Sequence, residues 1–340
     1  MKKSSLTIFR IIVSLFLILI LCSNHPVAQA AEKKVINAQQ SITMPRVEGE
    51  RLNKLLNYVR KSKHPVKNLN TRDLKKLGQE SSPYEYSISS QGDLIKSNTS
   101  LHSSNQFNSI FLQPNTTDNR VQINPTTSFP YNAIAQIDFT DGTYGYSCTG
   151  WFVDHNTVVT AAHCVYNAYN KKFYQGWAVY PAENGTDLPY GGEYTTEAYV
   201  SGGWQNTTPP SGESIYYKDV GFDYAVINLS INTNFPNHLS INSSVNVNDD
   251  IYSVGYPGDK SFQSNGSYYY YMYRSYGIIG KIESSTITHD AFVTAGMSGG
   301  PIMRPNSWGI VSLNSTSSWG PQLATDGPRG LIQQWGSINQ

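Results

Sequence analysis

Short apolar runs alternate with turn signals from about residue 109 to the end of the chain. The runs are rich in Val, Ile, Thr, Tyr and Trp, and their lengths fit strands better than helices. They comprise Ala133–Phe139, Cys148–Val153, Thr157–Thr160, Trp177–Tyr180, Tyr224–Leu229, Ile251–Val254, Tyr268–Tyr273, Ile278–Ile282 and Gly309–Leu313. Turn dipeptides lie between them, at Asp141-Gly142, Asn184-Gly185, Pro257-Gly258 and Asn265-Gly266. Many short strands with such turns predict an all-β sandwich or barrel.

Two other stretches have helical periodicity. Between Glu48 and Lys63, apolar residues recur at i, i+3, i+4 and i+7, which predicts an amphipathic helix that Pro65 ends. The apolar positions of this helix are Leu52, Leu55, Leu56 and Val59. A short closing helix from about Pro328 is predicted by three apolar residues on one helical face, Leu331, Ile332 and Trp335.

Residues 1–30 have the pattern of a secretory signal peptide. Basic residues within the first ten positions precede an apolar run of 12 residues, Ile11–Cys22, which is shorter than the ~20 residues of a membrane span. The small-x-small site Ala28-Gln29-Ala30 predicts a cut after Ala30. A lipoprotein anchor at Cys22 is a weaker alternative, because Leu21 stands where a small residue is expected. A retained membrane anchor is a lesser alternative.

The formal net charge of +1 conceals two oppositely charged parts. Residues 32–108 carry 13 Lys and Arg against 7 Asp and Glu, whereas residues 109–340 carry 9 against 17. This charge does not indicate a nucleic-acid-binding protein, but it favours a salt-sensitive association of the two parts. Beyond its one helix the basic part is polar, with too little apolar surface to fold alone. We interpret residues 31–108 as a basic propeptide, with a disordered linker or tail as the alternative.

A serine flanked by glycines is the first candidate for chemistry. The glycines and proline of Gly296-Met297-Ser298-Gly299-Gly300-Pro301 disfavour a helix or central strand, so this stretch predicts a loop that presents Ser298. A serine hydroxyl is a weak nucleophile that needs a base, and the base needs an orienting group. Thr160-Ala161-Ala162-His163-Cys164 supplies a histidine upstream, and Phe222-Asp223-Tyr224 supplies a carboxylate. Alone, the serine loop fits a surface turn; together, the three segments predict nucleophilic catalysis.

Each of the three residues has an expected role. Imidazole titrates near neutral pH, so His163 is suited to take the Ser298 proton and return it. Asp223 lies at the edge of an apolar run, where an unpaired carboxylate is costly, so we expect it to orient the imidazole. Asp219 is a minority alternative for this role. Poorer candidates lie in apparent turns, namely Asp250, Asp259 and Asp290. We expect the N–H groups of Gly296 and Ser298 to form an oxyanion hole.

The chain has three cysteines, and Cys22 lies in the signal peptide. In an exported chain the remaining two, Cys148 and Cys164, are most simply one disulfide. The loop between them would stabilise the fold by roughly 3 kcal/mol in the chain-entropy model, and would hold the segment of His163 against the preceding strand. A metal site needs more ligands than this pair offers, so we predict no metal and no other cofactor.

These segments together resemble the chymotrypsin-like serine peptidases, and most closely the bacterial glutamyl endopeptidases. Further matching stretches are Thr126–Tyr131, Ser147–Trp151 and Gly255–Lys260. The resemblance covers about residues 109–340. It implies an all-β fold of two six-stranded antiparallel β-barrels, with the catalytic site in the cleft between them and the closing helix at the C-terminus. It also implies secretion as a zymogen, with processing near Asn108-Ser109 to leave a peptidase domain of residues 109–340.

The residues that would set specificity depart from the family's pattern. Family members that prefer glutamate usually have Thr or Ser five residues before the nucleophile, where this chain has Val293, followed by Thr294. They also have a histidine in the strand after the nucleophile, where this chain has Val311 or Ser312. Phe292 is not acidic, so no charge is evident for a basic substrate side chain either. In related enzymes the new amino terminus helps to recognise an acidic side chain; the alternative here is an apolar pocket. Ser312 is a further candidate for binding the substrate backbone.

We therefore predict a secreted serine endopeptidase that works through an acyl-enzyme, with a glutamyl preference left open. A catalytically silent, chymotrypsin-like binding protein is the alternative from another class. An α/β-hydrolase esterase is disfavoured, because it needs the order Ser, Asp, His and alternating helices. The expected partners are polypeptide substrates, the chain's own propeptide and a processing protease. We expect a monomer, with no nucleic acid and no membrane association after signal removal.

Overall fold

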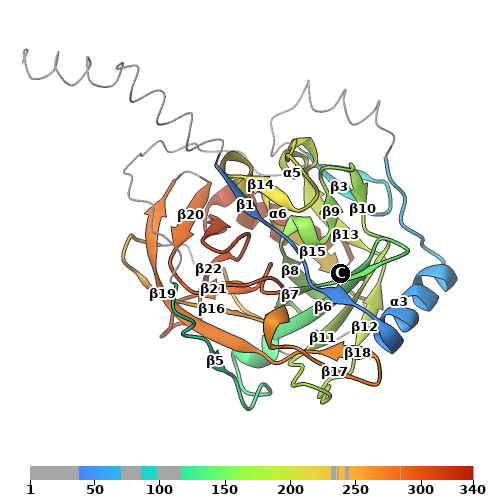
Figure 1. The fold of residues 1–340 in the computed structure, drawn as a ribbon. Helices are drawn as coiled ribbons and strands as arrows, with labels where there is room; N and C mark the ends of the chain where they lie inside the picture. The colour runs from blue at the N-terminus through green and yellow to red at the C-terminus, as the bar shows by residue number, and fades with distance from the viewer. Residues whose placement is uncertain are drawn as a thin grey trace, which may run out of the picture.

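A computed structural model of the chain describes residues 38–69, 86–97, 116–230, 235, 237–241, 245–283 and 285–339 (Figure 1). The predicted signal peptide and the predicted processing point at Asn108-Ser109 lie outside these residues. No helix within the described ranges combines the length and the apolar character that a membrane span requires.

The first of two large antiparallel sheets holds the strands that carry the candidate base and acid. The central strands are β6 (Ile134–Thr140), β7 (Gly145–Asp154), β8 (Thr157–Thr160), β11 (Gly176–Pro181), β12 (Glu193–Thr195), β13 (Ala198–Ser201) and β15 (Ala225–Asn228), and the further strands are β2 (Arg46–Val47), β3 (Tyr86–Ser89) and β4 (Leu94–Lys96). The order is β12-β11-β6-β7-β8-β15-β13-β3-β4, with β2 paired to β7. Short hairpins join β6 to β7, β7 to β8 and β3 to β4, and the sheet curls into a barrel on the right of Figure 1.

The second sheet has the order β22-β21-β16-β19-β20-β23, with β5 (Val121–Gln122) paired to β19. Its strands are β16 (Asp250–Gly255), β19 (Tyr273–Ile282), β20 (Thr286–His289), β21 (Pro301–Met303), β22 (Ile310–Leu313) and β23 (Trp319–Pro321). It forms the orange and red half of Figure 1. The fold is therefore all-β with two antiparallel barrels, as the sequence predicts.

Shorter elements connect these strands or lie at their ends. The two-stranded pairs comprise β9 (Tyr166–Asn167) with β10 (Lys172–Phe173), β17 (Phe262–Ser264) with β18 (Ser267–Tyr269), and β1 (Gln39–Ser41) with β14 (Ser214–Tyr216). The helices are α3 (Gly49–Lys61), α5 (Gly202–Asn206) and α6 (Asp326–Gly336), with short 3₁₀ turns η1 (Tyr131–Ala133), η2 (Ala162–Cys164), η3 (Tyr217–Phe222), η4 (Gly258–Lys260) and η5 (Ser337–Asn339).

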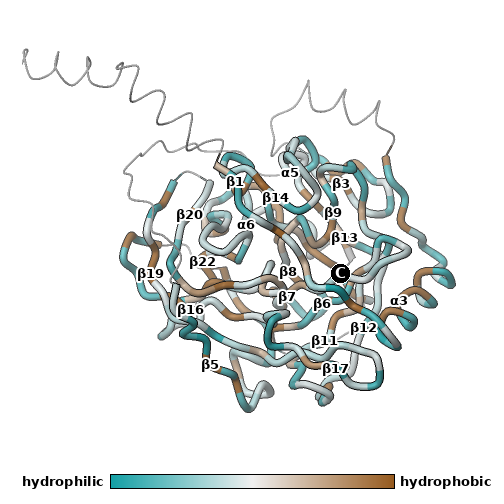
Figure 2. The backbone as a smooth tube through the Cα atoms, viewed as in Figure 1, coloured by the Kyte–Doolittle hydropathy of each residue, from teal (hydrophilic) through white to brown (hydrophobic). Residues whose placement is uncertain are grey.

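The core explains why the apolar runs become strands. Buried aromatic and aliphatic side chains fill the barrels, among them Trp151, Trp177, Ile251 and Val311. Figure 2 shows hydrophobic stretches along the central strands. The predicted closing helix is confirmed as α6, whose apolar face is fully buried.

One predicted strand is wrong in its bounds. The tyrosine-rich run Tyr268–Tyr273 is interrupted, because β18 ends at Tyr269 and β19 begins at Tyr273. Tyr270 and Met272 are fully buried in the segment between the two strands. The turn before this run is confirmed, since Asn265 and Gly266 both have positive φ, as a tight hairpin requires.

The basic N-terminal part is more structured than its polar sequence predicts. The predicted helix is confirmed as α3, and it packs Leu55 against Ala178 and Tyr180 of the first barrel. Part of the rest is ordered as well, because β3 (Tyr86–Ser89) and β4 (Leu94–Lys96) extend the first sheet beside β13. All residues of β3 are buried. These strands form by pairing with the peptidase part of the chain, which is compatible with a segment that cannot fold alone.

Candidate active site

The candidate base lies on a short turn directly after a buried strand. Strand β8 ends at Thr160, and His163 follows in the 3₁₀ turn η2. The side chain is 2% exposed. The predicted disulfide between Cys148 on β7 and Cys164 is present. It therefore ties the residue after His163 to the neighbouring strand, as expected from the sequence.

The candidate acid is fully buried and is bound to the base at two points. Asp223 follows the 3₁₀ turn η3 and precedes β15. Its Oδ2 atom accepts a hydrogen bond from Nδ1 of His163 at 2.8 Å, and its Oδ1 atom accepts one from the His163 backbone N–H at 2.9 Å. The Ser315 hydroxyl donates to the same Oδ2 at 2.5 Å. Three donors thus compensate the buried carboxylate and fix the ring orientation.

This pairing places the proton of the neutral imidazole on Nδ1, so Nε2 has a free lone pair. Nε2 of His163 is buried and has no hydrogen-bond partner within the described part of the chain. A buried acceptor without a hydrogen bond costs folding free energy, and such atoms in native proteins call for an explanation such as a catalytic role. It is suited to accept a proton from a serine hydroxyl that approaches it.

The candidate nucleophile lies in the loop between β20 and β21, and a glycine lets this loop approach the segment of the base. Ser298 is 7% exposed. A Cβ atom on Gly299 would lie 2.2 Å from Oγ1 of Thr160 and 2.7 Å from the backbone nitrogen of Ala161, and Gly299 has a φ of +82°. Only glycine fits both the space and the conformation. The glycine that follows the serine therefore brings the nucleophile loop against the residues that lead into His163.

Thr149, on β7, fixes the same loop from the first barrel. Its backbone N–H donates to the Ser298 carbonyl at 2.8 Å, and its hydroxyl donates to the Gly296 carbonyl at 2.8 Å. The N–H groups of Gly296 and Ser298 themselves donate to no group among the described residues. Two unpaired donors beside a serine hydroxyl are the arrangement that an oxyanion hole requires.

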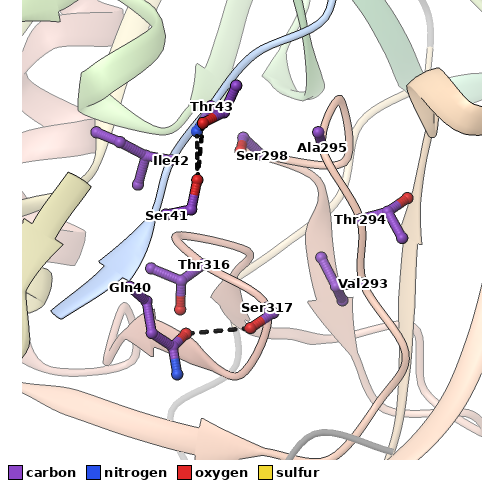
Figure 3. Close-up of a pocket in the computed structure, with 10 residues that line it drawn as sticks. All are labelled: Gln40, Ser41, Ile42, Thr43, Val293, Thr294, Ala295, Ser298, Thr316 and Ser317. Carbon is purple, nitrogen blue, oxygen red and sulfur yellow. Dashed lines mark hydrogen bonds between the residues drawn. The ribbon is translucent and has the colours of Figure 1, made fainter. Parts of the chain in front are cut away.

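A cavity of about 310 Å³ adjoins Ser298 (Figure 3). Its walls come from the loop before Ser298, from the segment after β22, and from the N-terminal segment. The lining residues are Gln40, Ser41, Ile42, Thr43, Val293, Thr294, Ala295, Ser298, Thr316 and Ser317. None of these side chains is charged.

The cavity contains two of the four residues that the sequence suggests for a substrate pocket. Val293 and Thr294 line it, whereas Val311 and Ser312 do not. Val311 packs in the core of the second barrel, and the Ser312 hydroxyl donates to the Pro321 carbonyl. Both lie on β22 and are fully buried, and the chain first reaches the cavity wall after this strand, at Thr316.

Thr294 belongs to the cavity wall, but its hydroxyl is engaged elsewhere. It donates to Asp259 at 2.7 Å and accepts a hydrogen bond from Arg120 at 2.7 Å. The Arg120 guanidinium also pairs with Asp259 and Asp118 and lies over the ring of Phe292. This arginine holds the pKa of the Asp259 carboxyl below its usual value. Since two carboxylates already neutralise Arg120, the cavity gains little positive charge from it.

Three residues that support the site were not predicted from the sequence. Ser315 and Thr149 hold the acid and the nucleophile loop, as described above. Asn314 accepts a hydrogen bond from the Gly299 N–H and donates from Nδ2 to the Met297 carbonyl. All three are ordinary polar residues in strands or loops, so no motif distinguishes them. The alternative acid, Asp219, makes no bond to His163 within the described residues.

Among the described residues, one group of three side chains could in principle bind a metal ion, and it comprises Cys148, His163 and Cys164. The two sulfur atoms are bonded to each other, so neither is a thiolate, and His163 is bound to Asp223. This group does not meet the three-ligand requirement of a catalytic zinc site.

Comparisons with known proteins agree with the geometry. Residues 148–313 match the trypsin-like peptidase domain family. An extracellular metalloprotease of Bacillus subtilis is 32% identical over 244 residues, which cover 67% of this chain and 69% of that protein. A glutamyl endopeptidase of Bacillus licheniformis is 32% identical over 193 residues, which cover 56% of this chain and 54% of that protein. The chain thus spans about half the length of the latter relative.

A solved structure of a Glu endopeptidase in complex with MPD is similar to this chain, and the match covers 65% of this chain and 97% of that one. The two share 28% sequence identity, with a TM-score of 0.54. The name metalloprotease belongs to the Bacillus subtilis protein and has no counterpart in the ligand group described above. The family match, the second relative and the solved structure all point to one class of hydrolase.

Proposed function

The chain belongs to the trypsin-like serine peptidases related to the glutamyl endopeptidases, and on this premise we propose that Ser298, His163 and Asp223 are its catalytic triad. One observation carries the proposal. Asp223 binds both the ring and the backbone of His163, while Nε2 is left as an unpaired acceptor, and the serine loop packs at Gly299 against Thr160 and Ala161, which lead into His163. The activity is hydrolysis of peptide bonds within polypeptides.

In the first half of the reaction, Ser298 Oγ attacks the scissile carbonyl carbon while Nε2 of His163 takes its proton. Asp223 stabilises the imidazolium that forms. When the tetrahedral intermediate collapses, the C–N bond breaks and Nε2 gives its proton to the leaving amine. A water molecule then attacks the acyl-enzyme by the same route, with His163 as base and then as acid.

The negative charge on the substrate oxygen develops beside the loop that holds Ser298. We assign its stabilisation to the N–H groups of Gly296 and Ser298, which are unpaired within the described residues. Thr149 binds the carbonyl oxygens of Gly296 and Ser298, so the backbone of both residues is held in place before the substrate arrives. Loss of one such donor typically raises the barrier by about 2.7–4 kcal/mol.

The chemistry of the cavity favours an uncharged side chain before the cut bond. Val293 lines the cavity, and Figure 3 shows the Thr294 side chain on the far side of its loop from Ser317. The hydroxyl that would bind a carboxylate is committed to Asp259 and Arg120. An apolar wall discriminates by only about 1–3 kcal/mol per methylene, so we expect a broad preference for small or aliphatic residues. We therefore favour a preference for apolar residues before the cut bond over a preference for glutamate.

The export and activation steps complete the proposal. Residues 1–30 act as a signal peptide, residues 31–108 as a propeptide, and residues 109–340 as a secreted peptidase domain. Support comes from the charge pattern of the sequence and from the extracellular relative. A processing protease cuts near Asn108-Ser109, and the propeptide inhibits the domain or assists its folding.

A cleavage-site map tests the specificity. Processed protein digests an unbiased peptide mixture, with Ser298→Ala as the blank, and the residue before each cut is tabulated. We expect cuts after small or aliphatic residues. Cuts confined to positions after glutamate would overturn the assignment of an uncharged pocket and would require a carboxylate ligand outside the cavity wall.

A further inference from the structure

The N-terminal segment crosses the candidate active site. Strand β1 pairs antiparallel with β14 on one side of the cleft, with Gln40 opposite Ile215. The next residues, Ile42 and Thr43, line the cavity that Ser298 also lines. Figure 3 shows this blue segment passing beside the nucleophile loop, with Thr43 near Ser298. We call residues 39–47 the strap.

The strap is held by backbone hydrogen bonds on both sides of Ser298. Before the serine, the Ile42 N–H donates to the Glu213 carbonyl at 3.0 Å. Beyond it, the Ser147 N–H donates to the Pro45 carbonyl at 2.9 Å, and β2 (Arg46–Val47) pairs with β7. An extended peptide bound as an added strand on both sides of a nucleophile is arranged as a polypeptide substrate would be.

One strap side chain fills a pocket beside the base. Ile42 is 5% exposed and lies in a hollow that His163, Tyr166 and Trp204 help to line. The space left in this hollow is about 10 Å³, which is no more than one water molecule needs. The strap therefore leaves no room for a substrate side chain in the hollow next to His163.

The strap does not fill the cavity beneath it. A volume of about 310 Å³ remains between the strap and the wall that contains Val293 and Ser317. Instead, Gln40 donates to the Ser318 hydroxyl at 2.9 Å and accepts from the Ser317 hydroxyl at 3.2 Å, at the rim. Because no strap side chain occupies the cavity, the segment covers the nucleophile without presenting the side chain that would align a bond for cleavage.

The strap is anchored away from the cleft by a buried arginine on the helix that follows it. Arg51 of α3 donates to Asp138 and to Glu183 at 2.7 Å each, and both acids are fully buried. It also donates to Gln136 at 2.6 Å and lies over the ring of Tyr180. Removing the arginine would leave two buried carboxylates without their counter-charge, which is strongly unfavourable.

These contacts join one recognition site to one blocking site. We propose that the peptidase domain binds its own N-terminal segment at an arginine-specific exosite formed by Asp138, Glu183 and Gln136, and that this binding holds the strap across Ser298 as a non-productive pseudosubstrate. The inference rests on the proposed function, since it requires Ser298 to be the nucleophile. The exosite takes a guanidinium group, because its acceptors match the fork of an arginine side chain.

The test measures how fast a fluorophosphonate probe labels Ser298 in the full chain, before any processing. Arg51→Met removes the anchor, and Ile42→Glu places a charge in the apolar hollow. Each change should speed labelling at least tenfold. Arg60→Met is the matched control, because Arg60 lies exposed on the same helix and donates to Asn57 within it; it should label at the parent rate. Thermal unfolding identifies variants that remain folded.

A second arm keeps the result decisive if a variant does not fold. A recognition sequence for a site-specific protease, inserted between Asn108 and Ser109, allows the N-terminal part to be cut and stripped from the parent chain. The stripped chain should label at least tenfold faster than the uncut chain. Equal labelling before and after stripping would overturn the strap and leave the proposed function intact. A stripped chain that neither labels nor hydrolyses peptides would overturn the proposed function itself.

Discussion

At the scale of single residues, the site depends on a few hydrogen bonds with defined roles. Asp223 receives three donors, two from His163 and one from Ser315, so its carboxylate cannot rotate freely. This holds the imidazole with its proton on Nδ1 and leaves Nε2 without a partner among the described residues. The acid therefore acts by fixing orientation and tautomer as much as by its charge.

Asp223→Asn tests this role. An amide in place of the carboxylate donates to Nδ1 and reverses the tautomer, so kcat for peptide hydrolysis by processed protein should fall by roughly 10⁴-fold. Asp219→Asn changes a nearby acid of the same turn that does not contact the base, and it should keep parent activity. Similar losses in the two variants would contradict the assignment of Asp223.

Ser315→Ala removes one donor from Asp223 and leaves the other two. A neutral-to-charged hydrogen bond of this kind is worth about 1.5–3 kcal/mol, so we expect kcat to fall by ~10- to 100-fold with KM unchanged. Ser317→Ala, which alters the cavity wall, should change KM instead. Steady-state kinetics on one peptide substrate separates the two effects. A change confined to KM in Ser315→Ala would remove this residue from the support of the acid.

The residues proposed for the catalytic triad lie in segments that the sequence distinguishes. Ser298 lies among glycines, and His163 precedes a cysteine. Ser315 and Thr149 were not predictable, because a hydroxyl that supports a loop has no sequence pattern of its own. Two of the four predicted pocket residues, Val293 and Thr294, line the cavity, because they lie close to Ser298 on the same loop. The opposite wall is formed by the segment after β22, and the path of that segment could not be predicted from the sequence.

At the scale of elements, strands with clear apolar runs were predictable, and those that depend on distant partners were not. The bounds of β8 match the predicted strand, and α6 lies where the closing helix is expected. β3 was not predicted because its alternating run is only four residues long and it pairs with β13, which is distant in the sequence. The direction in which Val311 points was open as well, since both faces of its strand are buried.

The disulfide belongs to this scale, because it joins β7 to the turn that carries His163. Replacing both Cys148 and Cys164 by Ser should lower the free energy of unfolding by roughly 3 kcal/mol, the chain-entropy value for a loop of this length. The loss should be visible in chemical denaturation of the Ser298→Ala chain, which cannot digest itself. Unchanged stability would mean that packing alone holds the turn.

At the scale of the whole molecule, the two oppositely charged parts of the sequence meet where Arg51 forms buried ion pairs with Asp138 and Glu183. Burial raises the pKa of Glu183 to about 7, although the neighbouring Arg51 acts in the opposite direction. Burial likewise raises the pKa of Asp138. The buried electrostatic contact between the basic part and the acidic part is therefore made by Arg51 of α3 with Asp138 and Glu183 of the first barrel. The exposed basic residues of α3 contribute by weaker, salt-screened attraction.

The raised pKa of Glu183 predicts a pH dependence of stability. Since the folded-state pKa lies above the unfolded value, this residue's contribution is fully present below the unfolded pKa, near 4.5. It is lost as the pH rises through about 7. In the Ser298→Ala chain, Glu183→Gln should therefore gain thermal stability relative to its parent between about pH 5 and pH 8. A relative Tm that stays constant over this range would contradict the burial argument.

The central claim is that peptide hydrolysis by this chain proceeds through a covalent intermediate on Ser298. The most direct measurement follows hydrolysis by the stripped chain during stoichiometric labelling with a fluorophosphonate, and identifies the labelled residue by mass spectrometry. We predict that activity falls in proportion to labelling, that the label is on Ser298, and that His163→Ala abolishes both. Hydrolysis that continues in fully labelled protein, or a label on another residue, would contradict the account.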